Sequence, residues 1–264
     1  MKIDISKLAK MLQDAVEHDL DEKVAVAFSG GLDSTTIATI AKNKSQVSLI
    51  TVGVENSEDL IAAKKVAKDL KLNLYEVLVN EEILFEDYKK MWKLMPGTLV
   101  DIELMCAIYE VCKKAKEIGC SSVLFGSGAE ELFIGYHKYY CALEEKKDLD
   151  QILKKEIETL PKRDILRTQN VAKICGVRAI FPLLHKPFVD IIFEIPAKDR
   201  IGPIEMKKPL LREIAKKLGV SDIAISRQKK AMQYGSNIHK IFLQMAKEKK
   251  IETYAPREPF VYDE

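Results

Sequence analysis

Three short apolar runs alternate with amphipathic helix patterns in the first third of the chain, and this alternation restricts the fold more than any other feature of the sequence. Strands are predicted over residues 24–28, 47–54 and 73–79, with helices over 34–42 and 59–70 between them. Strands joined through helices pair in parallel, with right-handed crossovers. The sequence therefore predicts an α/β fold built on an open, doubly wound parallel sheet.

The rest of the chain is mainly helical. A helix over 4–18, a helix over 102–118 and a strand over 122–125 complete the first half. Further helices are predicted over 148–160, 187–195, 207–218 and 236–250. No stretch rich in Gly, Ser or Pro separates the halves, so we expect one domain over 1–264. It comprises a nucleotide-binding α/β part (1–145), a mainly helical part packed on it (146–254) and a tail (255–264).

The charges of the chain nearly cancel. It has 42 Lys and Arg against 40 Asp and Glu, a net charge of +2, so no overall field draws it to nucleic acid or anionic lipid. Its five cysteines contain no CxxC pair, which argues against a zinc or thioredoxin-like motif. Residues 1–23 carry acids and no long apolar run, unlike a signal peptide or membrane anchor. We expect a cytoplasmic protein without nucleic-acid or membrane partners, and the sequence is compatible with a homo-oligomer.

The strongest chemical signal is the loop between the first predicted strand and its helix, Ser-Gly-Gly-Leu-Asp-Ser at 29–34. Its glycines let the backbone turn tightly and approach a ligand, while the helix start offers unpaired N–H groups and the positive end of its dipole. Ligands of open α/β sheets bind at the carboxyl ends of strands. The loop lacks the spacing and lysine of GxxxxGK[ST]. A plain connecting turn is the alternative, but the six residues together favour a phosphate cradle.

A second glycine-rich turn follows the fourth predicted strand. Residues 126–136 read Gly-Ser-Gly-Ala-Glu-Glu-Leu-Phe-Ile-Gly-Tyr, so Glu130 and Glu131 begin the next helix. Facing a bound triphosphate, a carboxylate here and Asp33 would hold Mg²⁺, which offsets the repulsion among the phosphates. The alternative is that two acids at a helix start only complement its dipole.

These motifs resemble those of a known superfamily. The loop at 29–34 is similar to the pyrophosphate-binding loop of the ATP pyrophosphatases, which cleave ATP between its α and β phosphates and adenylate a carboxylate or carbonyl oxygen. Residues 126–136 resemble the SGEGxDELFGGY segment of asparagine synthetases, and 207–212 with 227–236 resemble their K-x-x-LR and RxKxxFxxG pair. The resemblance covers roughly residues 8–247 in unbroken order. It implies a stand-alone synthase domain with an adenine nucleotide alpha hydrolase-like fold.

The resemblance also implies roles for individual residues. Pyrophosphate would be bound by the loop residues Ser29, Gly30, Gly31, Leu32, Asp33 and Ser34. Adenine would lie against Phe28 and the backbone of Val52, Phe125 and Gly126, and the nucleotide would also be bound by Lys208 and Arg227. The catalytic residues would be Asp33 and Glu130, which hold Mg²⁺, and Lys229, which touches the reacting phosphate and carboxyl and stabilises charge as pyrophosphate leaves. The alternative for the lysines is that they only solvate helix ends.

The chain departs from the family pattern at the acceptor side. Ser127 stands where the family has the Glu of SGEG, which is implicated in handling the amine, and Glu130 replaces the Asp of that motif. Arg178, Ile180 and His185 stand at the Glu, Arg and Asp of GVEARVPFLD. ATP binding is expected to survive these changes, which bear instead on the identity of the acceptor.

The synthase-like pattern begins almost at residue 1, and residue 2 is Lys. We therefore expect no amino-terminal glutaminase domain with its nucleophilic Cys; ammonia would arrive free, as another amine, or from a separate glutaminase subunit. The sequence predicts a ligase that adenylates an aspartate-like carboxylate and transfers ammonia or an amine, releasing AMP and pyrophosphate. The alternatives are a tRNA-modifying ATP pyrophosphatase, which the cysteines and charge disfavour, and a non-catalytic ATP-binding subunit or sensor.

Overall fold

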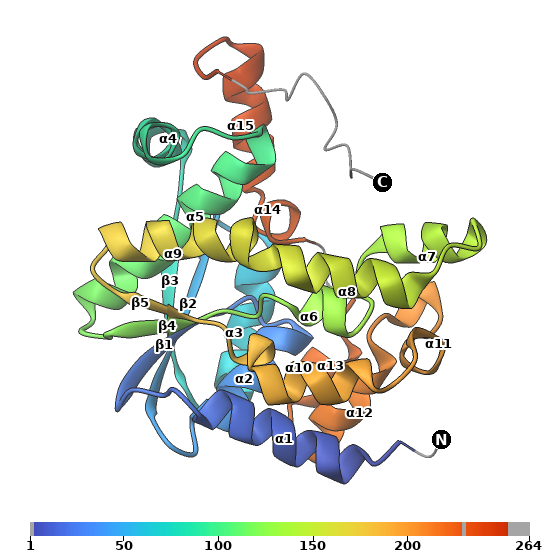
Figure 1. Cartoon of the computed structure of the whole chain (residues 1–264). Coiled ribbons are helices and arrows are strands. Elements are labelled where there is room, and N and C mark those ends of the chain that lie inside the picture. Colours follow the sequence, from blue (N-terminus) through green and yellow to red (C-terminus); the bar gives the residue numbers. More distant parts are fainter. Residues whose placement is uncertain (1–2, 229–230, 253–264) are drawn as a thin grey trace.

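Five parallel strands form one sheet in the order β3-β2-β1-β4-β5 (Figure 1). The structure is a computed structural model and describes residues 3–228 and 231–252. The strands are β1 (Lys23–Ala27), β2 (Gln46–Gly53), β3 (Asn73–Leu78), β4 (Ser122–Leu124) and β5 (Arg178–Ile180). Every pair of neighbouring strands is parallel. The open, doubly wound parallel α/β fold predicted from the sequence is confirmed.

The chain reverses its direction of travel across the sheet between β3 and β4. It moves outward from β1 to β2 and β3, then crosses to β4 on the other side of β1 and continues to β5. Val24 of β1 accordingly pairs with Val47 on one side and Ser122 on the other. In open α/β sheets, ligands bind beyond the carboxyl ends of the strands at such a switch point. The two glycine-rich loops leave β1 and β4 at this place.

The central strands are buried on both faces, which explains their continuous apolar sequence. In β1, Val24 and Val26 belong to one hydrophobic cluster and Ala25 to the other. In β2, Leu49 and Ile50 are divided in the same way. Parallel strands covered on both sides read as apolar runs instead of alternating patterns.

Helices cover both faces of the sheet (Figure 1). One face packs against α1 (Ile5–Glu17), α2 (Leu32–Ala41), α3 (Glu58–Leu70), α10 (Lys186–Phe193) and α12 (Pro209–Lys217). The other packs against α4 (Glu81–Leu94), α5 (Leu99–Glu117), α9 (Asp164–Ile174) and α15 (Ile238–Lys247). Among the helices in the described ranges, none has the length and apolar character needed to cross a membrane.

Shorter elements make up the rest of the secondary structure in the described residues. They are the helices α6 (Ala129–Leu132), α7 (His137–Glu144), α8 (Leu149–Thr159), α11 (Ala197–Arg200), α13 (Asp222–Ser226) and α14 (Met232–Gly235), with the 3-10 turns η1 (Leu160–Lys162), η2 (Pro182–Leu184) and η3 (Ile204–Met206). A third, small hydrophobic cluster around Tyr139 and Leu153 packs α7 and α8 together.

Element ends differ from the sequence prediction for identifiable reasons. The helix predicted over 207–218 begins only at Pro209, because Lys208 adopts a left-handed conformation (φ 60°) and proline suits a first helical position. The helix predicted over 236–250 is α15 with a separate turn, α14, before it. The prediction lacks α4, α9 and β5. The predicted tail over 255–264 lies outside the described residues.

Candidate functional site

The loop over 29–34 joins β1 to α2 and contains a conformation that favours glycine. Gly30 has a φ of +65°, and a Cβ there would lie 2.7 Å from the carbonyl carbon of Ala62 in α3. Across the turn, the hydroxyls of Ser29 and Ser34 lie 3.5 Å apart. Because the first N–H groups of α2 have no partner within the helix, the loop presents donors to an anion.

The loop after β4 lies against this first loop. Gly126 comes so near that a Cβ on it would lie 3.3 Å from the Cβ of Asp33. Gly128 precedes α6 with a φ of +93°, and a side chain there would meet Leu184 at 2.5 Å. This tight turn brings Glu130, in the first turn of α6, toward Asp33, in the first turn of α2.

Lys208 joins the two loops. Its ammonium donates to Oδ2 of Asp33 at 2.8 Å and to Oε1 of Glu130 at 2.7 Å. Burial alone would lower the pKa of Lys208, which is only 8% exposed, but the two carboxylates outweigh burial and the pKa is raised. Gly135 leaves room for the pair, because a side chain there would overlap both Glu130 and the Lys208 stem. The three charged groups form one ion cluster.

Arg227 supports the first loop through its backbone. One Nη donates to the carbonyl oxygen of Ser29 at 2.6 Å, and the other donates to Oδ1 of Asp59 at 2.7 Å. Asp59 lies in the first turn of α3 and is 2% exposed. The guanidinium therefore links the loop after β1 to the helix after β2.

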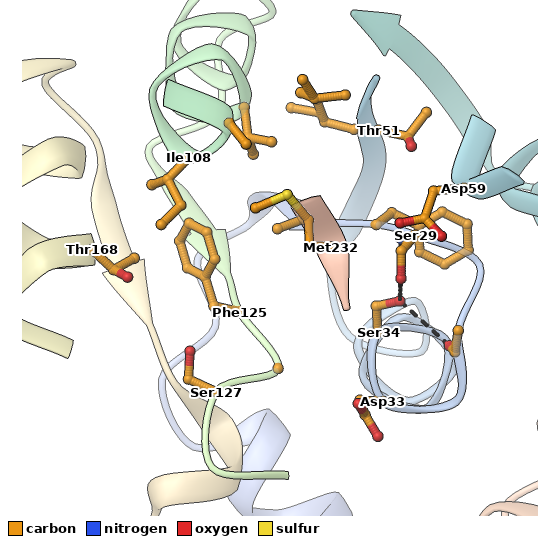
Figure 2. A pocket seen from close by; sticks show the side chains of 18 residues that line it. Ser29, Asp33, Ser34, Thr51, Asp59, Ile108, Phe125, Ser127, Thr168 and Met232 are labelled. Atoms are coloured by element: carbon orange, nitrogen blue, oxygen red, sulfur yellow. Dashed lines mark hydrogen bonds between the residues drawn. The ribbon is translucent and has the colours of Figure 1, made fainter. Parts of the chain in front are cut away.

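A cavity of about 260 Å³, here called the apolar cavity, opens beside the first loop (Figure 2). The residues predicted to surround adenine all line it, namely Phe28, Val52, Phe125 and Gly126. The loop contributes Ser29, Gly31, Asp33 and Ser34. In Figure 2, Phe125 lies on one side of this space, and Ser29 and Asp59 lie on the other. A ligand that has a flat apolar ring and polar groups at one end would fit this lining.

Further lining residues of the apolar cavity escape the sequence analysis. They come from five different elements: Thr51, Asp59, Ile108, Thr168 and Met232 (Figure 2). Met232 lies in the segment 227–236 that resembles RxKxxFxxG, but the resemblance gave it no role of its own. Their apolar or polar character alone carried no signal, because only the tertiary packing brings them together.

A second cavity of about 480 Å³, here called the polar cavity, shares Asp33 with the first. Its lining includes Leu32, Glu130 and the cations Lys207, Lys208, Arg212 and Arg227. Nη1 of Arg212 is buried and has no hydrogen-bond partner among the described residues. Guanidinium and ammonium groups beside a phosphate-type loop suit a polyphosphate. Gly30 lines neither cavity and serves the turn itself.

Asp33 and Glu130 fit a magnesium ion by their chemistry. Oδ1 of Asp33 is buried and has no hydrogen-bond partner within the described ranges. Magnesium at nucleotide sites takes one or two carboxylates together with phosphate oxygens. No group of three or more His, Cys, Asp or Glu side chains suited to a metal occurs in the described part of the chain. A metal at this pair would therefore need oxygens from the nucleotide as well.

Glu131, the second acid of the motif, lines a different cavity of about 360 Å³ with Glu156, Arg163 and Asp164. Glu131 is 4% exposed, and burial, reinforced by the neighbouring carboxylates, raises its pKa to about 7. Lys138 donates to Glu156 at 2.6 Å, so part of the charge in this cavity is paired. The two acids of the motif thus face different surroundings.

Lys229 lies outside the described residues, and its role stays a prediction. Gln228 and Ala231, close to it in sequence on either side, both line the polar cavity.

The departures from the family pattern fall into two groups. Ser127 lines the apolar cavity. Three others line none of the three cavities named above: Arg178, Ile180 and His185. Arg178 instead donates to Asp21 at 3.0 Å, and the ring of His185 packs in a tilted arrangement against that of His18, with centroids 4.5 Å apart. Only Ser127 and Glu130 therefore change the lining of the candidate site.

Comparisons with known proteins identify the family of the chain. The Asparagine synthase family model matches residues 7–146 and 142–264. The putative asparagine synthetase [glutamine-hydrolyzing] 1 of Methanocaldococcus jannaschii is 31% identical over an alignment of 260 positions, which covers 86% of this chain and 48% of that protein. Asparagine synthetase B [glutamine-hydrolyzing] of Escherichia coli is 27% identical over an alignment of 282 positions including gaps, which covers 97% of this chain and 50% of that protein.

The chain spans about half the length of these curated relatives. Among solved structures, NMN synthetase from Francisella tularensis aligns over 96% of this chain and 97% of that chain, with 14% identity and a TM-score of 0.46. Because the family match runs through both glycine-rich loops and the segments that supply Lys208 and Arg227, the chain belongs to the asparagine synthase family.

Proposed function

We propose that this protein is an ATP-dependent ligase that activates a carboxylate and transfers ammonia or an amine to it, releasing AMP and pyrophosphate. One observation carries the proposal. Asp33 lies where an apolar cavity and a cation-lined cavity meet, at the start of a helix that follows a glycine-rich loop. An adenine ring favours an apolar cavity, whereas a polyphosphate favours one lined by cations, and these two cavities lie side by side.

In this proposal the adenine lies in the apolar cavity, against Phe28, Phe125 and the backbone of Val52. The phosphates lie along the loop over 29–34, whose N–H groups and helix dipole favour negative charge. Arg227 keeps the loop in place through the Ser29 carbonyl. Asp33 and Glu130 hold Mg²⁺, which supplies positive charge that offsets the phosphates when it is bound.

The acceptor carboxylate attacks the α phosphorus from the polar cavity. The cations Lys207 and Arg212, which line that cavity, stabilise the charge that grows as pyrophosphate departs, together with Lys229, whose role is taken from the family resemblance. The amine then attacks the acyl adenylate, and AMP leaves. Holding carboxylate, phosphorus and amine in one complex converts separate encounters into steps within a single assembly.

The acceptor is proposed to be aspartate-like, as the names of the curated relatives suggest. Those relatives are named as glutamine-hydrolyzing, and the present chain spans about half of their length. We propose that ammonia reaches this chain free or from a separate glutaminase subunit.

The test is pyrophosphate release from ATP and Mg²⁺ with ammonium across a panel of amino acids. Release that depends on one acceptor, with AMP formed in equal amount, is the expected result. Tight ATP binding without turnover for any acceptor, and none restored by an added glutaminase, would overturn the ligase and favour a non-catalytic ATP-binding subunit. Formation of ADP and phosphate would also contradict the proposal.

Modification of tRNA is a further alternative, and the cysteines give it little support, because they form no CxxC pair and three of the five are buried. Cys106, Cys112 and Cys120 are buried, and burial raises the pKa of the Cys106 and Cys120 thiols. A tRNA affinity that falls steeply with salt would nevertheless revive it.

A further inference from the structure

Lys208 engages carboxylate oxygens that a metal ion would also need. Its Nζ lies within 2.8 Å of Oδ2 of Asp33 and 2.7 Å of Oε1 of Glu130. A magnesium ion requires still closer contact, about 2.1 Å, with the oxygens that bind it. An ammonium already seated between the two carboxylates would be in direct repulsion with such an ion.

The surroundings make this competition specific to Lys208. Its side chain is 9% exposed, so water screens it little. The neighbouring Lys207 places its ammonium 6.0 Å from the centroid of the Tyr140 ring. Arg212 donates from Nε to the backbone carbonyl of Lys207 at 2.8 Å. Of the cations that line the polar cavity within the described residues, Lys208 is the one bonded to both carboxylates.

The polar cavity gives the displaced ammonium a destination. Lys208 directly precedes α12 and its side chain lines this cavity of about 480 Å³, so a change of side-chain torsions suffices and the helix can stay in place. Apart from Lys208 and its two carboxylate partners, the charged lining of this cavity consists of three cations (Lys207, Arg212 and Arg227) and one acid, Glu205, so the ammonium gains little there unless a further anion is present. Phosphate oxygens of a nucleotide are that anion.

We propose that Lys208 is an internal counter-ion that a metal ion displaces, and that the polyphosphate of the nucleotide receives the displaced ammonium. This inference rests on the proposed function, because it assigns Asp33 and Glu130 to the metal. It follows that metal binding is weak without polyphosphate, and that metal and polyphosphate strengthen each other's binding. By linkage, the same factor must appear in both affinities.

The first test measures Mn²⁺ binding to the full chain by electron paramagnetic resonance of the free ion, without nucleotide. Lys208→Met should bind Mn²⁺ about tenfold more tightly than the wild type, a typical size for a coupling between two sites. Inorganic pyrophosphate should tighten Mn²⁺ binding in the wild type and do so less in this variant. Lys207→Met is the matched control, since it removes one positive charge from the adjacent position, and it should leave Mn²⁺ affinity close to that of the wild type.

Unchanged or weaker Mn²⁺ binding by Lys208→Met would overturn the inference, and so would an equal gain in Lys207→Met. Lys208→Arg keeps the charge and should keep Mn²⁺ binding weak, which separates the effect of charge from that of altered packing. These results are independent of turnover. If the chain releases pyrophosphate with an acceptor while the Mn²⁺ affinities are equal, only this inference fails; if Lys208→Met gains affinity but no acceptor supports turnover, only the proposed function fails.

A second test needs no variant and so does not depend on how Lys208→Met folds. Crystals of the wild-type chain grown with Mn²⁺ and pyrophosphate locate the ion by its anomalous scattering. The expected result is an ion bound by Asp33 and Glu130, with the Lys208 ammonium out of contact with both carboxylates and next to pyrophosphate oxygens. An ion on Asp33 while Lys208 still contacts both carboxylates would overturn the displacement.

Discussion

The guanidinium of Arg227 donates a hydrogen bond of 2.6 Å to the carbonyl oxygen of Ser29, across 198 positions of sequence. The same guanidinium binds the buried Asp59. The arginine of the RxK motif therefore supports the phosphate-type loop from the protein side, whatever the lysine of the motif does. This motif has a structural task in addition to the chemical one proposed for it.

Arg227→Met should weaken ATP binding and lower stability. Removing one partner of a buried ion pair lowers the free energy of unfolding by about 3 kcal/mol. Because the loop over 29–34 would lose its bond to Arg227, the KM for ATP should rise by a larger factor than kcat falls. Urea unfolding and initial rates measure the two effects. Arg178→Met, which breaks exposed ion pairs away from the cavities, should change unfolding by about 0.5 kcal/mol or less. An unchanged KM for ATP in Arg227→Met would show that the loop keeps its shape without this bond.

Gly30→Ala should abolish ATP binding and destabilise the fold. The new Cβ would lie 2.7 Å from backbone atoms of α3, in addition to the strain of a φ of +65°. Gly219 provides the control, because its φ is +71° and a Cβ there meets nothing within 4 Å. Gly219→Ala should cost only the left-handed backbone penalty of about 1–2 kcal/mol. Equal losses for the two variants in urea unfolding would contradict a steric role for the contact with Ala62.

Glu131 should make the stability of the protein fall as the pH rises toward neutrality. Its pKa is about 7 in the folded chain against 4.5 for an unperturbed Glu, so the folded state holds the proton more tightly. The corresponding stability is fully present below pH 4.5 and is lost as the pH rises through about 7. Glu131→Gln should therefore be more stable than the wild type above that range, by on the order of 3 kcal/mol.

The same comparison at pH 4 should show almost no difference between Glu131→Gln and the wild type, because both side chains are then neutral. Glu158→Gln on the exposed side of α8 is the control and should leave the pH dependence as it is. Parallel stability curves for wild type and Glu131→Gln from pH 4 to 8 would show that burial of this carboxyl has no energetic effect.

Lys229→Ala should abolish turnover while ATP still binds and the chain stays folded, since the proposed contact of this lysine forms in the transition state. Single-turnover pyrophosphate release and equilibrium ATP binding separate the two effects. Lys230→Ala is the matched control in the adjacent position and should retain activity. A fully active Lys229→Ala would remove this residue from the proposed mechanism.

Sequence reasoning located the parts of the site that a single segment carries. Phe28 and the loop after it follow one strand, so their positions relative to a ligand depend on local geometry alone. Met232 and Thr168 reach the apolar cavity from separate helices, and their apolar or small polar side chains look no different from ordinary packing residues. Information of this kind is present only in the tertiary arrangement.

The pairing of charges in the ion cluster was likewise not predictable from the sequence. Lys208 is separated from Asp33 by 175 positions and from Glu130 by 78, and its motif suggested a nucleotide contact. Its pairing with both acids depends on where α12 packs against the two loops. In the fold, β5 is missing from the prediction because its three residues begin with the exposed Arg178, whereas the equally short β4 is buried throughout and leads into a glycine-rich turn.

The position of β5 also has a consequence for how the chain is made. Residues 178–180 pair with β4, so the sheet gains its last strand only after more than half of the polypeptide has left the ribosome. Until then, β4 presents an unpaired edge, the kind of surface that invites wrong pairing between nascent chains. A fragment cut after residue 145 would keep that edge permanently, so attempts to produce the nucleotide-binding half alone should extend past Ile180 to give a monomeric product.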